Sequence, residues 1–90
     1  MKFEWDAEKN KGNLEKHKIS FEDALRVFLG SHITLELDCD DEQRFAAIGT
    51  VDSKFFTLNY TMRGKKIRII SARSARTDEE EYYEKIFGNR

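Results

Sequence analysis

The chain has 90 residues with a formal net charge of −1, and 37% of its residues are charged while 39% are hydrophobic. This length predicts a single domain over residues 1–90, and the near-neutral charge is not that of a basic nucleic-acid-binding protein. No apolar run approaches the roughly 20 residues of a membrane-spanning helix, and the first residues lack the pattern of a signal peptide, so we expect a cytoplasmic protein.

The N-terminal third predicts a short strand and two helices. Residues 2–5 can form the strand, and Asp6 can cap a helix that runs to about Lys16, although that helix has few apolar residues. Ser20 can cap a second helix that ends at Gly30. Its apolar face is expected to comprise Phe21, Ala24, Leu25, Phe28 and Leu29, which follow helical spacing.

The middle of the chain changes to the two-residue period of strands. Residues 33–37, 44–51, 55–61 and 65–71 each predict a strand. Asp52-Ser53 and Arg63-Gly64 are typical of tight turns, and short turns between successive strands indicate antiparallel pairing.

The last segment predicts a C-terminal helix. Thr77 and Glu80 have the spacing of a capping box, Tyr83, Ile86 and Phe87 could pack the helix onto the sheet, and Gly88 ends it. The predicted fold is therefore α+β. It has a four- to five-stranded, mainly antiparallel sheet with two N-terminal helices and one C-terminal helix.

No phosphate-binding glycine loop, paired-cysteine zinc pattern or nucleophile elbow is present. Cys39 is alone in the acidic stretch 38–42, which favours an inert surface thiol. His17 and His32 lack the spacing of helical metal ligands. The acidic stretch could hold a metal ion but more simply predicts a solvated loop, so we expect no metal and no cofactor.

The main lead for function is a basic run. Six basic residues and no acidic one lie between positions 63 and 76, and they include Arg68, Arg73 and Arg76. Guanidinium groups bind phosphate bidentately. Strand alternation would divide these charges between two faces, and they could instead pair with Glu79, Glu80 and Glu84 or with the acidic loop.

Two further side chains could take part in chemistry. His17 lies between the first two predicted helices, and an imidazole there could be an exposed polar group or an acid–base catalyst. Tyr60 shares a predicted strand face with Phe56 and Leu58, which favours a place in the core over stacking on a nucleobase.

Four segments occur in an order and spacing that carry a family resemblance. They are Phe3-Glu4-Trp5-Asp6 with Lys9 and Asn13; Lys16-His17 with Ile19-Ser20-Phe21-Glu22 and Ala24; Glu42-Gln43-Arg44-Phe45-Ala46-Ala47-Ile48-Gly49; and Ile67-Arg68-Ile69-Ile70-Ser71-Ala72-Arg73 with Ala75 and Arg76. Together they resemble the BrnT toxins of bacterial type II toxin–antitoxin systems. One position departs from the family, because Lys18 stands where a glycine usually follows the Lys-His pair.

The resemblance implies a RelE/ParE-like fold and a ribonuclease that blocks translation and arrests growth. It also implies neutralisation by a BrnA-type antitoxin in a hetero-oligomer, with operator DNA contacted through the antitoxin. Membranes are not an expected partner. Two alternatives stay open: a toxin of the same fold that inhibits a protein target, and an inactive module that only binds the antitoxin.

Cleavage of RNA without a metal needs a base, an acid and positive charge around the phosphate. Arg68, Arg73 and Arg76 are the candidates for the charge, with Lys9 as a further cation. His17 is the first candidate for acid–base work, and Tyr60 and Lys9 are the alternatives.

Overall fold

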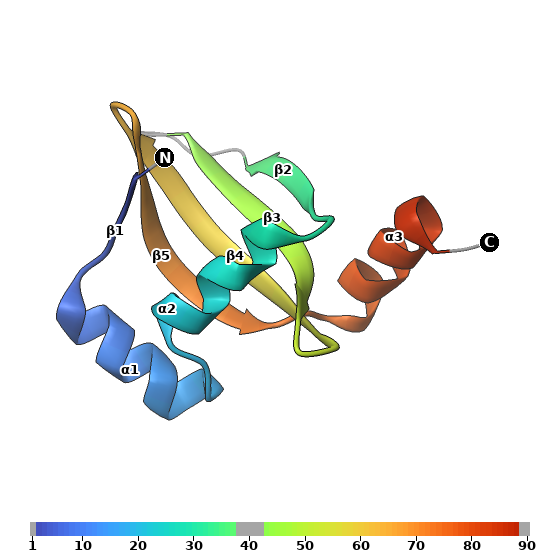
Figure 1. Cartoon of the computed structure of the whole chain (residues 1–90), viewed down its shortest axis with the longest axis horizontal. Helices are drawn as coiled ribbons and strands as arrows, with labels where there is room; N and C mark the ends of the chain where they lie inside the picture. Colours follow the sequence, from blue (N-terminus) through green and yellow to red (C-terminus); the bar gives the residue numbers. More distant parts are fainter. Residues whose placement is uncertain (1, 38–42, 89–90) are drawn as a thin grey trace.

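The computed structural model describes residues 2–37 and 43–88 and confirms the α+β class (Figure 1). The elements are β1 (Lys2–Glu4), α1 (Ala7–His17), α2 (Phe21–Ala24), η1 (a 3-10 helix, Leu25–Leu29), β2 (Ile33–Leu37), β3 (Arg44–Val51), β4 (Lys54–Arg63), β5 (Lys66–Ser74) and α3 (Thr77–Phe87). The acidic stretch 38–42 with Cys39, considered above as a solvated loop, lies outside the described residues.

The five strands form one sheet in the order β1-β5-β4-β3-β2. Strands β2 to β5 pair antiparallel in sequence order, as expected from their short connections. β1, however, runs parallel to β5, with Phe3 opposite Ile67. The sheet is therefore mixed, and the prediction of a mainly antiparallel sheet is wrong. The alternation of residues in a three-residue strand does not reveal which strand pairs with it when that strand lies more than 60 residues away in sequence.

The two tight turns follow from residues that adopt positive φ. Asp52 and Ser53 have φ values of 53° and 70°, and they join β3 to β4 at the predicted position. Positive φ at both central residues matches the twist of a hairpin. Gly64, with φ of 60°, begins the second turn, which lies one residue later than predicted.

The second predicted helix is divided in two. Ser20 Oγ caps α2 by accepting a hydrogen bond from Asp23 N, but after one turn the chain continues as the 3-10 helix η1. A 3-10 helix has three residues per turn, so Val27 joins Phe21 and Ala24 on the buried side. Leu25 and Phe28 are partly buried and pack against the same core, as predicted. Val27 is fully buried, whereas Leu29 is 85% exposed, and the predicted place of Leu29 on the apolar face is wrong.

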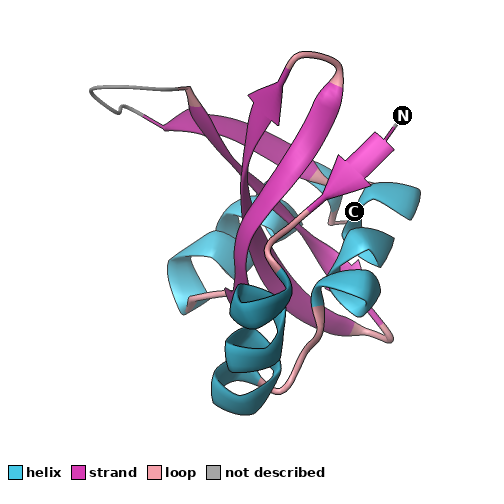
Figure 2. Ribbon diagram, turned by 90° about the vertical axis from the view of Figure 1, so that its left-hand side faces the viewer, coloured by secondary structure: helices cyan, strands magenta, loops and turns pink. Residues whose placement is uncertain are grey.

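α2 and η1 cover one face of the sheet, which we call the helix face. Its core comprises Phe21, Ala24 and Val27 from the helices and Leu58, Tyr60, Ile67, Ile69 and Ala72 from β4 and β5. α3 lies against the opposite face, since Glu79 at its start bonds Thr57 of β4. We call this opposite face, which carries Thr57, Asn59 and Thr61 of β4, the α3 face. Helices are seen on both sides of the sheet in Figure 2.

α1 is attached to the sheet by amide side chains rather than by apolar ones. Leu14 is half exposed, while Asn13 is buried. Asn13 Nδ2 donates to Ile19 O at 3.0 Å, and Asn13 Oδ1 accepts from the backbone N–H of Ala72 in β5 at 3.1 Å. β1 pairs with only the first part of β5, and Asn13 bonds a backbone N–H of β5 beyond that part. This bond explains how α1, which has few apolar residues, is attached to the sheet.

Candidate active site

A β-bulge brings Arg68 and Arg73 to the same face of the sheet. Directly opposed residues in neighbouring strands share a face. Thr61 of β4 lies opposite Arg68 and Thr57 lies opposite Arg73, so both arginines are on the α3 face. The register shifts by one residue after Asn59, which leaves Ile70 as the additional residue in β5. Simple alternation would have placed the two arginines on opposite faces.

The carboxylate of Glu79 joins β4, β5 and the start of α3. Its Oε1 accepts hydrogen bonds from Arg73 Nη1 at 2.9 Å, from Thr57 Oγ1 at 2.8 Å and from the backbone N–H of Arg76 at 2.8 Å. Its Oε2 accepts from Arg73 Nη2 at 3.0 Å and from Arg76 Nη2 at 3.3 Å. The carboxylate is therefore surrounded by donors from three elements, and only 11% of the side chain is exposed.

These donors determine the ionisation of Glu79. Burial raises the pKa of its carboxyl group, but hydrogen bonds from Arg73, from the Arg76 backbone and from Thr57 outweigh burial and lower the pKa from 4.5 to about 2. The hydrogen bond to Glu79 also raises the pKa of Arg73, against the effect of burial. Glu79 is thus an anion at every physiological pH.

The start of α3 differs from the predicted capping box by one residue. Arg76, not Thr77, occupies the N-cap position, and Glu79, not Glu80, accepts the N-cap N–H. Of the three glutamates considered as partners for the arginines, only Glu79 bonds Arg73 and Arg76 in residues 43–88. Glu80 and Glu84 bind neither Arg73 nor Arg76 in residues 43–88.

The three arginines differ in how firmly they are held. Arg68 Nη1 lies 3.1 Å from Glu4 Oε2, with 29% of the Arg68 side chain exposed. Arg73 is 26% exposed and is held bidentately by Glu79. The Arg76 side chain is 68% exposed, and its contacts with Glu79 and Asp78 are longer, at 3.3 and 3.7 Å. Arg76 is therefore the most accessible of the three to a polyanion.

The structure does not bring the other predicted residues to this site. Lys9 is exposed and His17 half-buried, and both lie on α1 at the edge of the sheet. Neither contacts the three arginines through a hydrogen bond or ion pair in the described ranges. Tyr60 is 7% exposed and stacks on Phe45 on the helix face, so it belongs to the core on the other side of the sheet.

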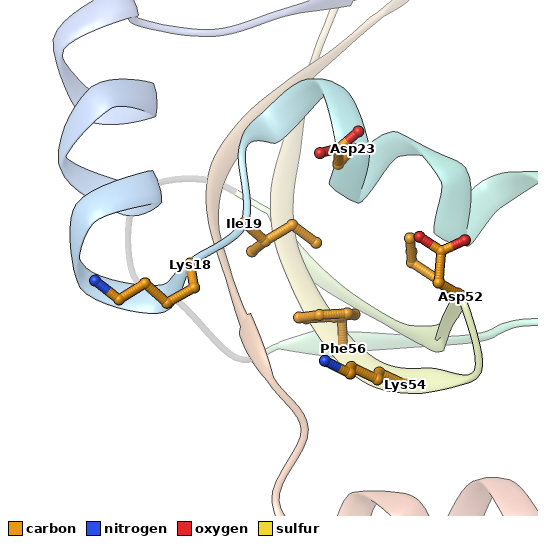
Figure 3. Close-up of a pocket in the computed structure, with 7 residues that line it drawn as sticks. Lys18, Ile19, Asp23, Asp52, Lys54 and Phe56 are labelled. Carbon is orange, nitrogen blue, oxygen red and sulfur yellow. The ribbon is translucent and has the colours of Figure 1, made fainter.

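The chain turns after His17 at Lys18, which adopts the left-handed conformation with φ of 64° and ψ of 26°. Lys18 therefore takes the backbone conformation that favours glycine, which is the residue that the family resemblance led us to expect at this position. Lys18 lines an open hollow on the helix face, which has a volume of about 180 Å³. Figure 3 shows the side chains around it. The hollow is also lined by Ile19, Asp23, Val51, Asp52, Lys54 and Phe56. Its charges are of both signs.

Lys18→Gly is expected to stabilise the protein by about 1 kcal/mol, because glycine adopts the left-handed conformation without the steric cost of a Cβ atom. Thermal unfolding followed by circular dichroism measures the change. Lys16→Gly is the matched control, since Lys16 is helical, and this variant should lose about 1 kcal/mol. An unfolding temperature for Lys18→Gly at or below that of the parent chain would contradict this account of the turn.

Two other kinds of site are absent from the described residues. Within residues 2–37 and 43–88, no three His, Cys, Asp or Glu side chains cluster in a way that could hold a metal ion. No described helix is long and apolar enough to cross a membrane. The acidic side chains between positions 38 and 42 are outside these ranges.

Comparison with known proteins gives a family. Residues 5–79 match the model of a family described as the ribonuclease toxin BrnT of type II toxin–antitoxin systems. The match runs from just before α1 to the first turn of α3, so it includes all three arginines and Glu79. A search of curated proteins found no match. Because the family match covers most of the chain, this protein belongs to the BrnT family of ribonuclease toxins.

Proposed function

We propose that the chain is a metal-independent endoribonuclease toxin that cleaves RNA and so blocks translation. Membership of a ribonuclease family supports the reaction class. The observation that carries the proposed site is the bulge at Ile70, which puts Arg68 and Arg73 on one face beside Arg76. Guanidinium groups supply the positive charge that a transferring phosphate and its neighbours along the strand require, which supports a mechanism without a metal.

In the proposed reaction the ribose 2′-oxygen forms a bond to phosphorus while the bond from phosphorus to the 5′-oxygen breaks. A base takes the 2′-hydroxyl proton, and an acid gives a proton to the departing 5′-oxygen. The products are a 2′,3′-cyclic phosphate and a 5′-hydroxyl. Arg73 and Arg76, which both bond Glu79, stabilise the dianionic transition state, and Arg76 is the more exposed of the two. Arg68 contacts another phosphate of the strand. For the acid–base role His17 stays the first candidate and Lys9 the alternative, although both lie on α1 and neither bonds the arginines in the described residues. Tyr60 is left out because it packs in the core on the helix face.

The proposed partner is a BrnA-type antitoxin that neutralises the toxin in a hetero-oligomer. Membership of a type II toxin–antitoxin family supports a protein antitoxin. Operator DNA is contacted through that antitoxin, and the toxin acts in the cytoplasm. The order of elements, with the helical segments α1, α2 and η1 before the β2–β5 strands and one helix after them, supports a RelE/ParE-like fold.

A second candidate is an inactive module that binds the antitoxin without cutting RNA. One observation favours it: Arg68, Arg73 and Arg76 each face a carboxylate, which partly neutralises the site. On this reading the arginines stabilise the domain and bind no substrate.

Expression of the chain alone in bacteria separates the two candidates. A ribonuclease should arrest growth and shorten cellular RNA within the same period. Normal growth with intact RNA, at confirmed levels of folded protein, would favour the inactive module. Arrest with intact RNA would point to a protein target instead.

A further inference from the structure

A polar pair, Asn59 and Ser71, lies between Arg68 and Arg73 on the α3 face. Asn59 of β4 is directly opposite Ser71 of β5. The Asn59 amide nitrogen donates to Ser71 Oγ at 3.0 Å, and both residues are half-buried. An asparagine side chain also has an acceptor oxygen, and a serine hydroxyl also has a donor proton. Within the described residues, neither of these two groups has a hydrogen-bond partner, so the pair can bind a further group.

The position of Asn59 is unusual for a residue with a purely structural role. β4 lies in the middle of the sheet, and asparagine is disfavoured in strands. The neighbours of Asn59 on the same face are Thr57 and Thr61, whose hydroxyls are already used by Glu79 and by the backbone oxygen of Gln43. Asn59 and Ser71 are thus the polar pair with unused hydrogen-bonding capacity beside the arginines.

The spacing suits a short segment of a nucleic-acid strand. Thr57 and Thr61, which mark the positions of Arg73 and Arg68, are four residues apart in β4. At about 3.4 Å per residue their Cα atoms are about 14 Å apart, with Asn59 midway. A cation therefore lies on each side of a neutral donor–acceptor pair. Phosphate contacts fix the register of a nucleic acid, while the ribose 2′-hydroxyl, which both donates and accepts, distinguishes RNA from DNA.

We propose that Asn59 and Ser71 form a subsite for the ribose 2′-hydroxyl of an RNA strand whose phosphates lie at Arg68 and Arg73. The 2′-hydroxyl donates to Asn59 Oδ1 and accepts from the Ser71 hydroxyl. The hydrogen bond between the two side chains holds them in place before the RNA arrives. This subsite deepens the proposed ribonuclease function and rests on it, and it makes the protein select RNA over DNA.

The test compares the binding of a fluorescent single-stranded RNA with that of DNA of the same mixed sequence. Stopped-flow fluorescence anisotropy in EDTA records binding before any cleavage. The parent chain should bind RNA about tenfold more tightly than DNA, the change expected from one or two hydrogen bonds. Asn59→Ala and Ser71→Ala should each lose most of this preference while DNA binding stays the same. Ser74→Ala, the same change at an exposed position of β5, should keep it.

Each outcome decides the proposal. Equal affinity of the parent chain for RNA and DNA, absence of binding to either, or an unchanged preference in folded Ser71→Ala would overturn it. Ser71→Ala removes one hydroxyl, so this variant keeps the test valid if Asn59→Ala fails to fold. An RNA preference that depends on Asn59 and Ser71 in a chain that does not cut RNA would support the subsite and refute the proposed ribonuclease function. Cleavage of RNA without such a preference would support the proposed ribonuclease function and refute the subsite.

Discussion

Replacing Glu79 with glutamine is expected to lower the free energy of unfolding at pH 7 by about 2–3 kcal/mol. The folded protein lowers the pKa of this carboxyl group from 4.5 to about 2, so the anion is strongly favoured in the folded state. Glutamine keeps the shape but loses the charge that Arg73 binds with two hydrogen bonds. It also leaves a guanidinium that is 26% exposed without its anion. Urea denaturation at pH 7 measures the effect.

The same variant should change the response to acid. Because the folded-state pKa of Glu79 lies below its unfolded value, its stabilisation is complete above pH 4.5 and is lost as the pH falls towards 2. The parent chain should therefore lose more stability across this range than Glu79→Gln does. Glu81→Gln, an exposed position of the same helix, is the control and should behave like the parent. Equal stability of Glu79→Gln and Glu81→Gln at pH 7 and near pH 2 would refute the role assigned to Glu79.

Arg76→Ala is expected to slow RNA cleavage by about 10²–10³-fold, the usual cost of removing one group that stabilises transition-state charge. The loss should be separable from folding, because the Arg76 side chain is 68% exposed and its ion pairs are of the kind worth about 0–1 kcal/mol. Initial rates on a labelled RNA and the unfolding temperature, measured on the same sample, give the two quantities.

Three further variants show whether the loss is specific to Arg76. Lys85→Ala removes an exposed cation from the far end of α3, so it shows how much of the loss comes from general attraction of RNA. Arg73→Ala should lose cleavage and stability together, since it leaves the buried carboxylate of Glu79 short of its main partner. Arg73→Lys keeps the charge without the planar fork and should be better folded but still slow. A rate for Lys85→Ala as low as that for Arg76→Ala would remove the specific role of Arg76.

The features predicted correctly from sequence depend on local chemistry. Asp6 accepts hydrogen bonds from Glu8 N and Lys9 N at the start of α1, as its position before a helix predicted. β3 has the predicted bounds. The turn at Asp52-Ser53 is also where it was predicted, because two residues that tolerate positive φ separate two segments with the alternating apolar pattern of strands. In these cases the interactions that decide the structure join residues only a few positions apart.

The features that were missed depend on distant partners. The parallel pairing of β1 with β5 joins residues 2–4 to residues 66–68, and η1 buries Val27 in a core shared with β4 and β5. The bulge at Ile70 had the largest consequence for function, because alternation from Arg68 would have put Arg73 on the wrong face. A register shift arises from the pairing of two strands. It changes the periodic pattern of neither sequence, so the sequence does not reveal it.

The candidate site was predicted in part. The basic run led to the arginines, and the family resemblance linked them to RNA. The sequence indicated Glu79 only as one of several acidic residues that could pair with the arginines, and it did not indicate the central role of Glu79. Asn13 and Asn59 gave a signal that could have been used, since each is an amide at a position where the local pattern favours another residue type. Such amides are buried or half-buried here and hold hydrogen bonds across elements.

The most direct test of the central claim is cleavage of free RNA by the purified, antitoxin-free chain in excess EDTA, with Arg76→Ala beside it. The account predicts cleavage that EDTA does not reduce, products with 2′,3′-cyclic phosphate ends, and loss of nearly all activity in the folded variant. Cleavage that stops in EDTA, or that continues at the parent rate in folded Arg76→Ala, would contradict it.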